Sequence, residues 1–172
     1  MGLAVLVSLE LGLGLGLTAF KGNLRPWLAL GHELLGLMLL GGVLFHWGWL
    51  AQGHDGGLAR LWPRDKKAWQ EVALDVRALF RFEPRAGGVR TGLAGLVQGL
   101  GLLLVSVQGL IGLTMFLLLS PNGELPARLE FLKVWHQALA WGVLGYLSVH
   151  LGMALWHAKR RDGTLAAMWP WR

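Results

Sequence analysis

Cysteine is absent from the 172 residues of this chain. This absence excludes disulfides, thiolate metal sites, iron–sulfur clusters and covalently attached c-type haem, because each of them needs a cysteine sulfur. Charge is also scarce: charged residues make up 15% of the chain, against about a quarter in an average soluble domain. Hydrophobic residues reach 54%, which excludes intrinsic disorder. The composition therefore favours a membrane protein.

Four stretches with almost no charge are long enough to cross a membrane, since a helical span needs about 20 apolar residues. They cover residues 1–20, 26–50, 91–119 and 134–158, and the only acidic or basic side chains well inside them are Glu10 and Glu33. The first stretch lacks the preceding Lys or Arg and the small-residue cleavage site of a signal peptide, so we expect it to be retained as a helix. The sequence predicts an all-α fold, a four-helix transmembrane bundle that forms a single membrane domain over residues 1–172.

Residues 51–90 form the only substantial segment outside the predicted spans. The other two connections are short turns rich in Gly, Pro and Asn. Within the long segment, residues 65–82 mix apolar with basic residues at helical spacing, which predicts an amphipathic helix along the membrane surface. A plain polar loop with some helix is the alternative.

The distribution of Lys and Arg predicts the orientation of the chain. Eight of the sixteen lie in residues 51–90, four lie in the C-terminal tail, and the two short turns share the other four. Because cytoplasmic loops of membrane proteins carry the excess of Lys and Arg, we expect the long loop and both termini in the cytoplasm. The cytoplasmic loops then account for the net charge of +6, so we expect no nucleic-acid partner. The expected surrounding of the chain is membrane lipid.

Four histidines lie inside two of the spans at one spacing. His32 and His46 are fourteen residues apart in the second span, and His136 and His150 are fourteen residues apart in the fourth. Fourteen helical residues rise about 21 Å and return close to the same face. Two helices separated by one other span run in the same direction, so His32 is level with His136 and His46 with His150. Facing imidazoles at one depth can hold a metal, and a porphyrin with its iron between them is a bis-histidine haem b. Because the two pairs lie at two depths in the membrane, they predict two haems.

Two other interpretations use the same histidines. A haem-free membrane scaffold would use them for hydrogen bonds between helices, and a divalent-metal transporter would use them as metal ligands. Ionisable side chains inside a bilayer usually have a function. Zinc is disfavoured because no acidic or cysteine ligands accompany the pair of His46 and His150.

Further polar and small residues lie near the predicted histidine levels. His54 and His157 make a third level at the cytoplasmic edge, where proton transfer or quinone binding competes with a plain interfacial position. Glu10 either belongs to a proton path to a quinone or packs against another polar group. Glu33 either orients a ligand or faces the headgroups. Gly36, one turn after the first histidine, either leaves clearance for a flat ring or allows close helix packing.

The histidines and their neighbours resemble a known family. The run HELLG from His32, the run HWGW from His46, and the pair Trp135–His136 followed by His150 are similar to the prokaryotic four-helix b-type membrane cytochromes. That group includes the haem-bearing membrane subunits of formate dehydrogenases and nickel–iron hydrogenases.

The resemblance implies a dihaem protein of a prokaryotic plasma (inner) membrane that moves electrons between a quinone pool and a redox protein partner or complex subunits. Carried over to this chain, His32, His46, His136 and His150 would be the axial ligands of the haem irons. The segment 51–90 matches nothing in that group, so the resemblance leaves the partner and substrate open.

Overall fold

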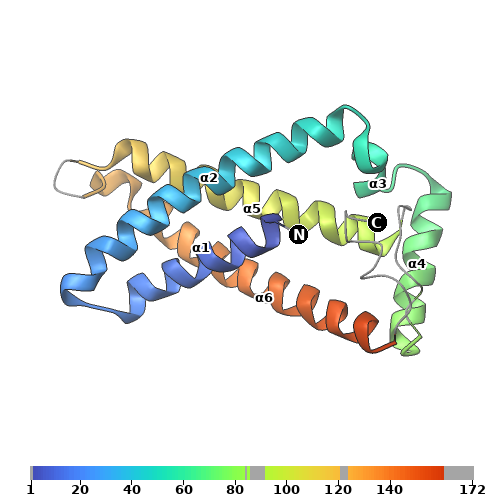
Figure 1. The fold of residues 1–172 in the computed structure, drawn as a ribbon. Coiled ribbons are helices and arrows are strands. Elements are labelled where there is room, and N and C mark those ends of the chain that lie inside the picture. The colour runs from blue at the N-terminus through green and yellow to red at the C-terminus, as the bar shows by residue number, and fades with distance from the viewer. Residues whose placement is uncertain (1, 84, 86–91, 121–123, 161–172) are drawn as a thin grey trace. The chain divides into compact units, whose positions relative to one another are not determined.

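The structure, a computed structural model, describes residues 2–83, 85, 92–120 and 124–160. Within these residues all regular structure is helical. The four long helices are α1 (Gly2–Ala19), α2 (Arg25–Ala51), α5 (Leu93–Leu118) and α6 (Phe131–Arg160), as Figure 1 shows. Each is long and apolar enough to cross a membrane. The predicted all-α fold with four spans is confirmed. Some residues used in that prediction lie outside the described residues: Met1 and Thr91 at the starts of the first and third spans, and Arg90, Arg161 and Arg172 in the charge count.

The connections contain shorter helical elements. These are the 3₁₀ turns η1 (Gly22–Leu24), η2 (His54–Gly56) and η3 (Ala127–Leu129), and the helices α3 (Gly57–Leu61) and α4 (Lys66–Phe80). The side chain of Asp65 caps the start of α4 by accepting a hydrogen bond from the backbone N–H of Ala68 at 2.7 Å. The helix predicted within residues 65–82 is therefore present. The sequence did not predict α3.

The chain divides into two compact units. The first unit consists of Met1–Leu44 and Leu103–Leu147, and the second unit of Phe45–Leu102 and Ser148–Arg172. Helix α1 belongs to the first unit, α3 and α4 belong to the second, and α2, α5 and α6 contribute residues to both.

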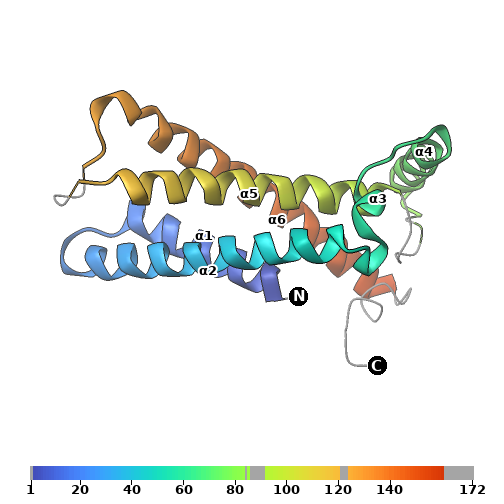
Figure 2. The ribbon, with the colours of Figure 1, turned by 90° about the horizontal axis from the view of Figure 1, so that it is seen from above.

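Small residues allow the helices of the first unit to approach closely. Helices α1 and α2 form an antiparallel hairpin (Figures 1 and 2), in which a Cβ atom at Gly16 would lie 3.5 Å from Leu28. At Gly109 of α5, a Cβ would lie 3.1 Å from Leu40 of α2. Such contacts are typical of membrane helix pairs. The buried apolar side chains of this unit are Val7, Leu39, Leu40, Val43, Leu125 and Val143.

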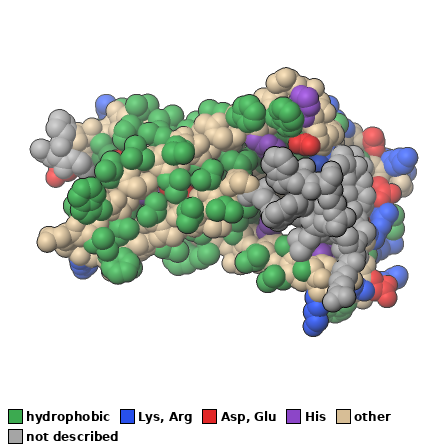
Figure 3. Space-filling model, viewed as in Figure 1, with side chains coloured by type: hydrophobic (Ala, Val, Ile, Leu, Met, Phe, Trp, Pro, Cys, Tyr) green, Lys and Arg blue, Asp and Glu red, His purple; other side chains and the backbone are tan. Residues whose placement is uncertain are grey.

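Most side chains on the outside of the first unit are apolar. In Figure 3 green apolar side chains are spread over the visible face among tan backbone atoms. Trp27, Met38 and Leu117 expose 67–72% of their surface. Helices that expose apolar side chains over their whole length are unfavourable in water and favourable among lipid tails. With its four spans, the chain is a membrane protein.

In the second unit, α3 packs against the first turns of α5. A Cβ at Gly95 would overlap the carbonyl oxygen of Arg60, and one at Gly99 would lie 3.0 Å from the Cβ of Leu61. The guanidinium of Arg60 also donates to the side-chain oxygen of Gln98. Gly95, Gly99 and Gln98 of α5 therefore serve contacts between helices.

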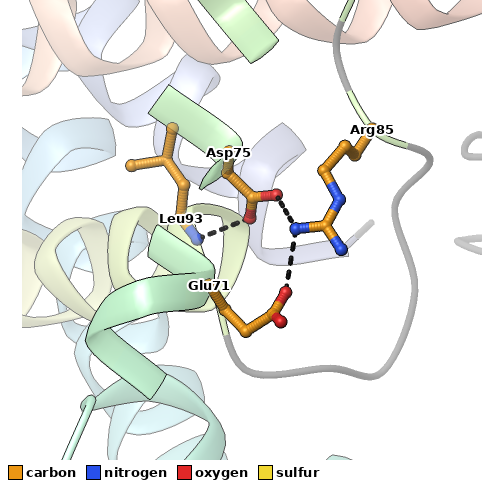
Figure 4. A network of polar contacts seen from close by, with 4 residues as sticks. All are labelled: Glu71, Asp75, Arg85 and Leu93. Carbon is orange, nitrogen blue, oxygen red and sulfur yellow. Dashed lines mark hydrogen bonds and ion pairs between the residues drawn. The ribbon is translucent and has the colours of Figure 1, made fainter. Parts of the chain in front are cut away.

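A polar network ties α4 to the start of α5 in the second unit (Figure 4). The Oδ2 atom of Asp75 accepts from the backbone N–H of Leu93 at 3.0 Å, and its Oδ1 lies 3.3 Å from the guanidinium of Arg85. Arg85 also donates to Glu71 at 2.8 Å, and this hydrogen bond raises the pKa of the guanidinium above its ordinary value. Because the first N–H groups of a helix have no partner within it, Asp75 caps α5 from a neighbouring helix.

Candidate functional site

The structure brings together one of the two predicted histidine pairs. His32 of α2 and His136 of α6 both belong to the first unit. Their ring centroids lie 6.0 Å apart, and the ring planes make an angle of 79°. The two imidazoles thus meet, as the common direction of their helices predicts. Their role as axial ligands stays a prediction.

A cavity of about 500 Å³ lies between the helices of the first unit and includes both rings in its wall. Leu, Val and Gly residues make up most of the lining, and the polar side chains among them include Glu10, Gln108 and Lys133. Pockets of 300–1,000 Å³ with a mainly apolar wall and a few placed polar groups are typical of small-molecule and cofactor sites. The cavity has the character that a flat, largely apolar ring with two carboxylates requires.

A glycine of the neighbouring helix lies against each imidazole. A Cβ at Gly14 of α1 would lie 3.2 Å from Cε1 of His32, and a Cβ at Gly112 of α5 would lie 3.2 Å from Cε1 of His136. At this distance even the methyl group of an alanine would be tight at either glycine, so a larger side chain there would displace the imidazole ring. Neither Gly14 nor Gly112 was predicted from the sequence to lie against a histidine ring.

Gly36 does not face open space for a flat ring. A Cβ at Gly36 would lie 2.9 Å from Oε1 of Glu10, so this glycine makes room for the carboxyl group of α1. Of the two roles weighed for Gly36, close helix packing is the one that the structure supports.

The buried polar atoms near the rings are not all satisfied. The Nδ1 atoms of His32 and His136 are buried without a hydrogen bond, as is Oε2 of Glu10. Nδ1 of His32 lies 2.8 Å from Oε1 of Glu10, at ion-pair distance although without hydrogen-bond geometry. Of the two roles weighed for Glu10, packing against a polar group is therefore observed, and that group is His32. Since buried polar atoms are normally paired, this cluster is a candidate site for a ligand.

Gln108 fixes the backbone at the second histidine. Its Nε2 donates to the carbonyl oxygen of His136 at 3.0 Å, which joins α5 to α6 at this level. Its Oε1 is buried without a partner.

The donor set fits a haem. Two bonds of about 2 Å from imidazole nitrogens to one metal, together with the two ring radii, place the ring centroids about 6 Å apart. The observed separation is 6.0 Å. In the part of the chain that the structure describes, no group of three His, Cys, Asp or Glu side chains is arranged to hold a metal ion. Two axial nitrogens suffice only if the bound group supplies the equatorial ligands, as a porphyrin does.

The second predicted pair lies in the second unit. His46 of α2 is half-buried and His150 of α6 is exposed. Their pairing as ligands stays a prediction. His54 of η2 stacks on Trp49 of α2 with ring centroids 3.8 Å apart, and Trp49 donates its Nε1–H to Asp55 at 3.1 Å. His157 is half-buried in the last turn of α6, where a basic side chain suits the helix dipole.

Comparison with known proteins identifies one match. Residues 1–171 match the family model described as prokaryotic cytochrome b561. No curated protein and no solved structure matches the chain.

Proposed function

Because the chain belongs to the prokaryotic cytochrome b561 family, and is therefore a membrane b-type cytochrome that takes part in electron transfer, we propose that it is a dihaem protein. In this proposal His32 and His136 are the axial ligands of one haem b, and His46 and His150 are those of the other. Electrons pass across the bilayer between a quinone pool and a redox partner. The quinone and the partner are suggested by the family in general terms.

The observation that carries the proposal is the pair of neighbouring imidazoles, His32 and His136, in the wall of an apolar cavity. The 6.0 Å between the rings suits a shared metal, and the cavity of about 500 Å³ suits a cofactor. The second pair repeats the first at the same fourteen-residue spacing on the same two helices, which corresponds to a rise of about 21 Å along each. That repetition supports a second haem.

The side chains of the first unit have separable tasks. The bound haem iron supplies the one-electron chemistry. His32 and His136 hold it from two sides, while the apolar lining excludes water and keeps the dielectric low, which tunes the potential. Lys133 lines the cavity, and its ammonium group, which lies 2.9 Å from Oε1 of Glu130 in the structure, would exchange that partner for a propionate.

We also propose that the long loop and both termini are cytoplasmic. Twelve of the sixteen Lys and Arg residues lie in the loop and the C-terminal tail, which supports this orientation.

The test is a dithionite-reduced minus air-oxidised spectrum of the purified protein, with a pyridine haemochrome assay of haem per chain. We expect two b-type haems. His32→Ala and His136→Ala should lose one and the same haem, and His46→Ala and His150→Ala the other. His54→Ala, which removes a histidine stacked on Trp49, is the matched control and should keep both. A colourless preparation from haem-supplied cells, or retention of both haems in all four variants, would contradict the proposal.

A further inference from the structure

The first unit pairs an acidic residue with one of its two histidines. Glu10 is the only charged residue of α1, and its Oε1 lies 2.8 Å from Nδ1 of His32. Gly14, four residues later, lies against Cε1 of the same ring. Because residues four apart share one face of a helix, α1 presents both to His32.

Helices α5 and α6 repeat this arrangement with a different polar residue. Gln108 of α5 precedes Gly112 by four residues, and Gly112 lies against Cε1 of His136. Gln108, however, donates to the backbone carbonyl of His136 rather than reaching its ring. The two histidines therefore have unequal neighbours, since a carboxyl group lies at the ring nitrogen of His32 alone.

We propose that Glu10 is a positioning residue for His32: its carboxyl group accepts the Nδ1–H, holds the ring with its other nitrogen toward the iron, and makes His32 the stronger electron donor of the pair. The proposal rests on the proposed function, in which His32 and His136 are axial ligands. A carboxylate that accepts a hydrogen bond from the second nitrogen of a metal-bound histidine fixes the tautomer and raises the basicity of the ligand. A more basic ligand stabilises the ferric state and lowers the midpoint potential.

Two contacts favour this role over a plain hydrogen bond between helices. The carboxyl oxygen lies 2.8 Å from Nδ1, the atom that a histidine ligated through Nε2 has left to donate, and this atom is buried without a hydrogen bond to any other group. In addition, Gly36 on α2 leaves the space that Oε1 occupies, because a Cβ there would lie 2.9 Å away. Both the acceptor and the room for it are provided beside the ring.

The experiment compares Glu10→Gln and Glu10→Leu with the unmodified full-length protein. The matched control is Glu33→Gln, which removes a carboxylate next to His32 in the chain and on the wall of the same cavity. The readouts are haem per chain, the midpoint potentials of both haems by redox titration, and the electron paramagnetic resonance spectrum of the oxidised protein. The spectrum reports the orientation of the axial imidazole planes.

We expect both haems to be retained in Glu10→Gln, with a higher midpoint potential for the haem that His32→Ala removes. In Glu10→Leu the same haem should show the higher potential and also an altered resonance, because no acceptor holds the ring. Glu33→Gln should shift the potential less. Should Glu10→Leu fail to fold, Glu10→Gln still reports the potential.

An equal shift in Glu33→Gln would assign the effect to charge alone and overturn the positioning role. Unchanged potentials and resonances in the Glu10 variants, with His32→Ala still losing a haem, would overturn the positioning role and leave the haem ligands in place. Retention of both haems in His32→Ala would instead overturn the ligand assignment on which the inference rests.

Discussion

Gly14 of α1 lies beside the ring of His32 of α2, because a Cβ added at position 14 would lie only 3.2 Å from Cε1 of the ring. The space for the imidazole thus comes from a missing side chain on the neighbouring helix. Gly12, two residues earlier on the same helix, is exposed and has nothing within 4 Å of its Cβ position. The two glycines form a matched pair for testing whether the room at His32 serves haem binding.

Gly14→Leu should lose the haem that His32→Ala removes, because the larger side chain displaces the ring from its partner. Overpacking of this kind costs about 1–3 kcal/mol. Gly12→Leu projects outward and should keep both haems. Pyridine haemochrome assays on the two purified variants provide the measurement. Equal haem content in both would show that the contact at Gly14 is unimportant for binding.

The four spans and the proximity of His32 to His136 were predictable because they depend on the length and the rise per residue of each helix taken alone. Span length follows from the run of apolar residues, and the level of a histidine follows from its distance along the helix. Chain direction alternates from span to span, which places the two rings at one depth. No knowledge of side-chain packing enters these steps.

The contact between Glu10 and His32 was not predicted, because it depends on the register between two helices. Each residue lies eleven positions from Lys21, at the turn between α1 and α2. A hairpin symmetric about that turn brings the two level, so the signal was present. Helix α3 is a different case: five residues are too few to show a helical period, and its packing on Gly95 and Gly99 of α5 is tertiary.

Gly95→Ala should destabilise the protein, although alanine is the better helix former by about 1 kcal/mol. The new methyl group would overlap the carbonyl oxygen of Arg60, which is backbone and cannot move aside without shifting α3. Gly145→Ala in α6, where nothing lies within 4 Å, should be neutral or stabilising. Thermal unfolding of both variants in one detergent measures the difference. A higher melting temperature for Gly95→Ala would refute the close contact between α3 and α5.

Asp75→Ala should loosen α4 from the start of α5. Asp75 is 8% exposed, and its loss leaves the N–H of Leu93 without its acceptor, which costs about 1–3 kcal/mol for a buried group. Arg85→Ala removes only the more exposed ion-pair partner and should lower the stability less than Asp75→Ala does, because exposed ion pairs contribute little. Thermal unfolding ranks the two variants. If Arg85→Ala were the more damaging, the network would depend on the ion pair and not on the cap of α5.

Cysteine labelling can determine the orientation, because the chain has no cysteine of its own and therefore no background. Asn23 lies in the short turn η1, and Gln70 is an exposed residue of α4. The variants Asn23→Cys and Gln70→Cys therefore each place one thiol outside the spans. The segment 51–90 carries eight Lys and Arg residues and the first turn only two, so the positive-inside rule places α4 in the cytoplasm. A membrane-impermeant maleimide should label Asn23→Cys in intact spheroplasts and Gln70→Cys only after permeabilisation. The reverse pattern would place the long loop and both termini outside.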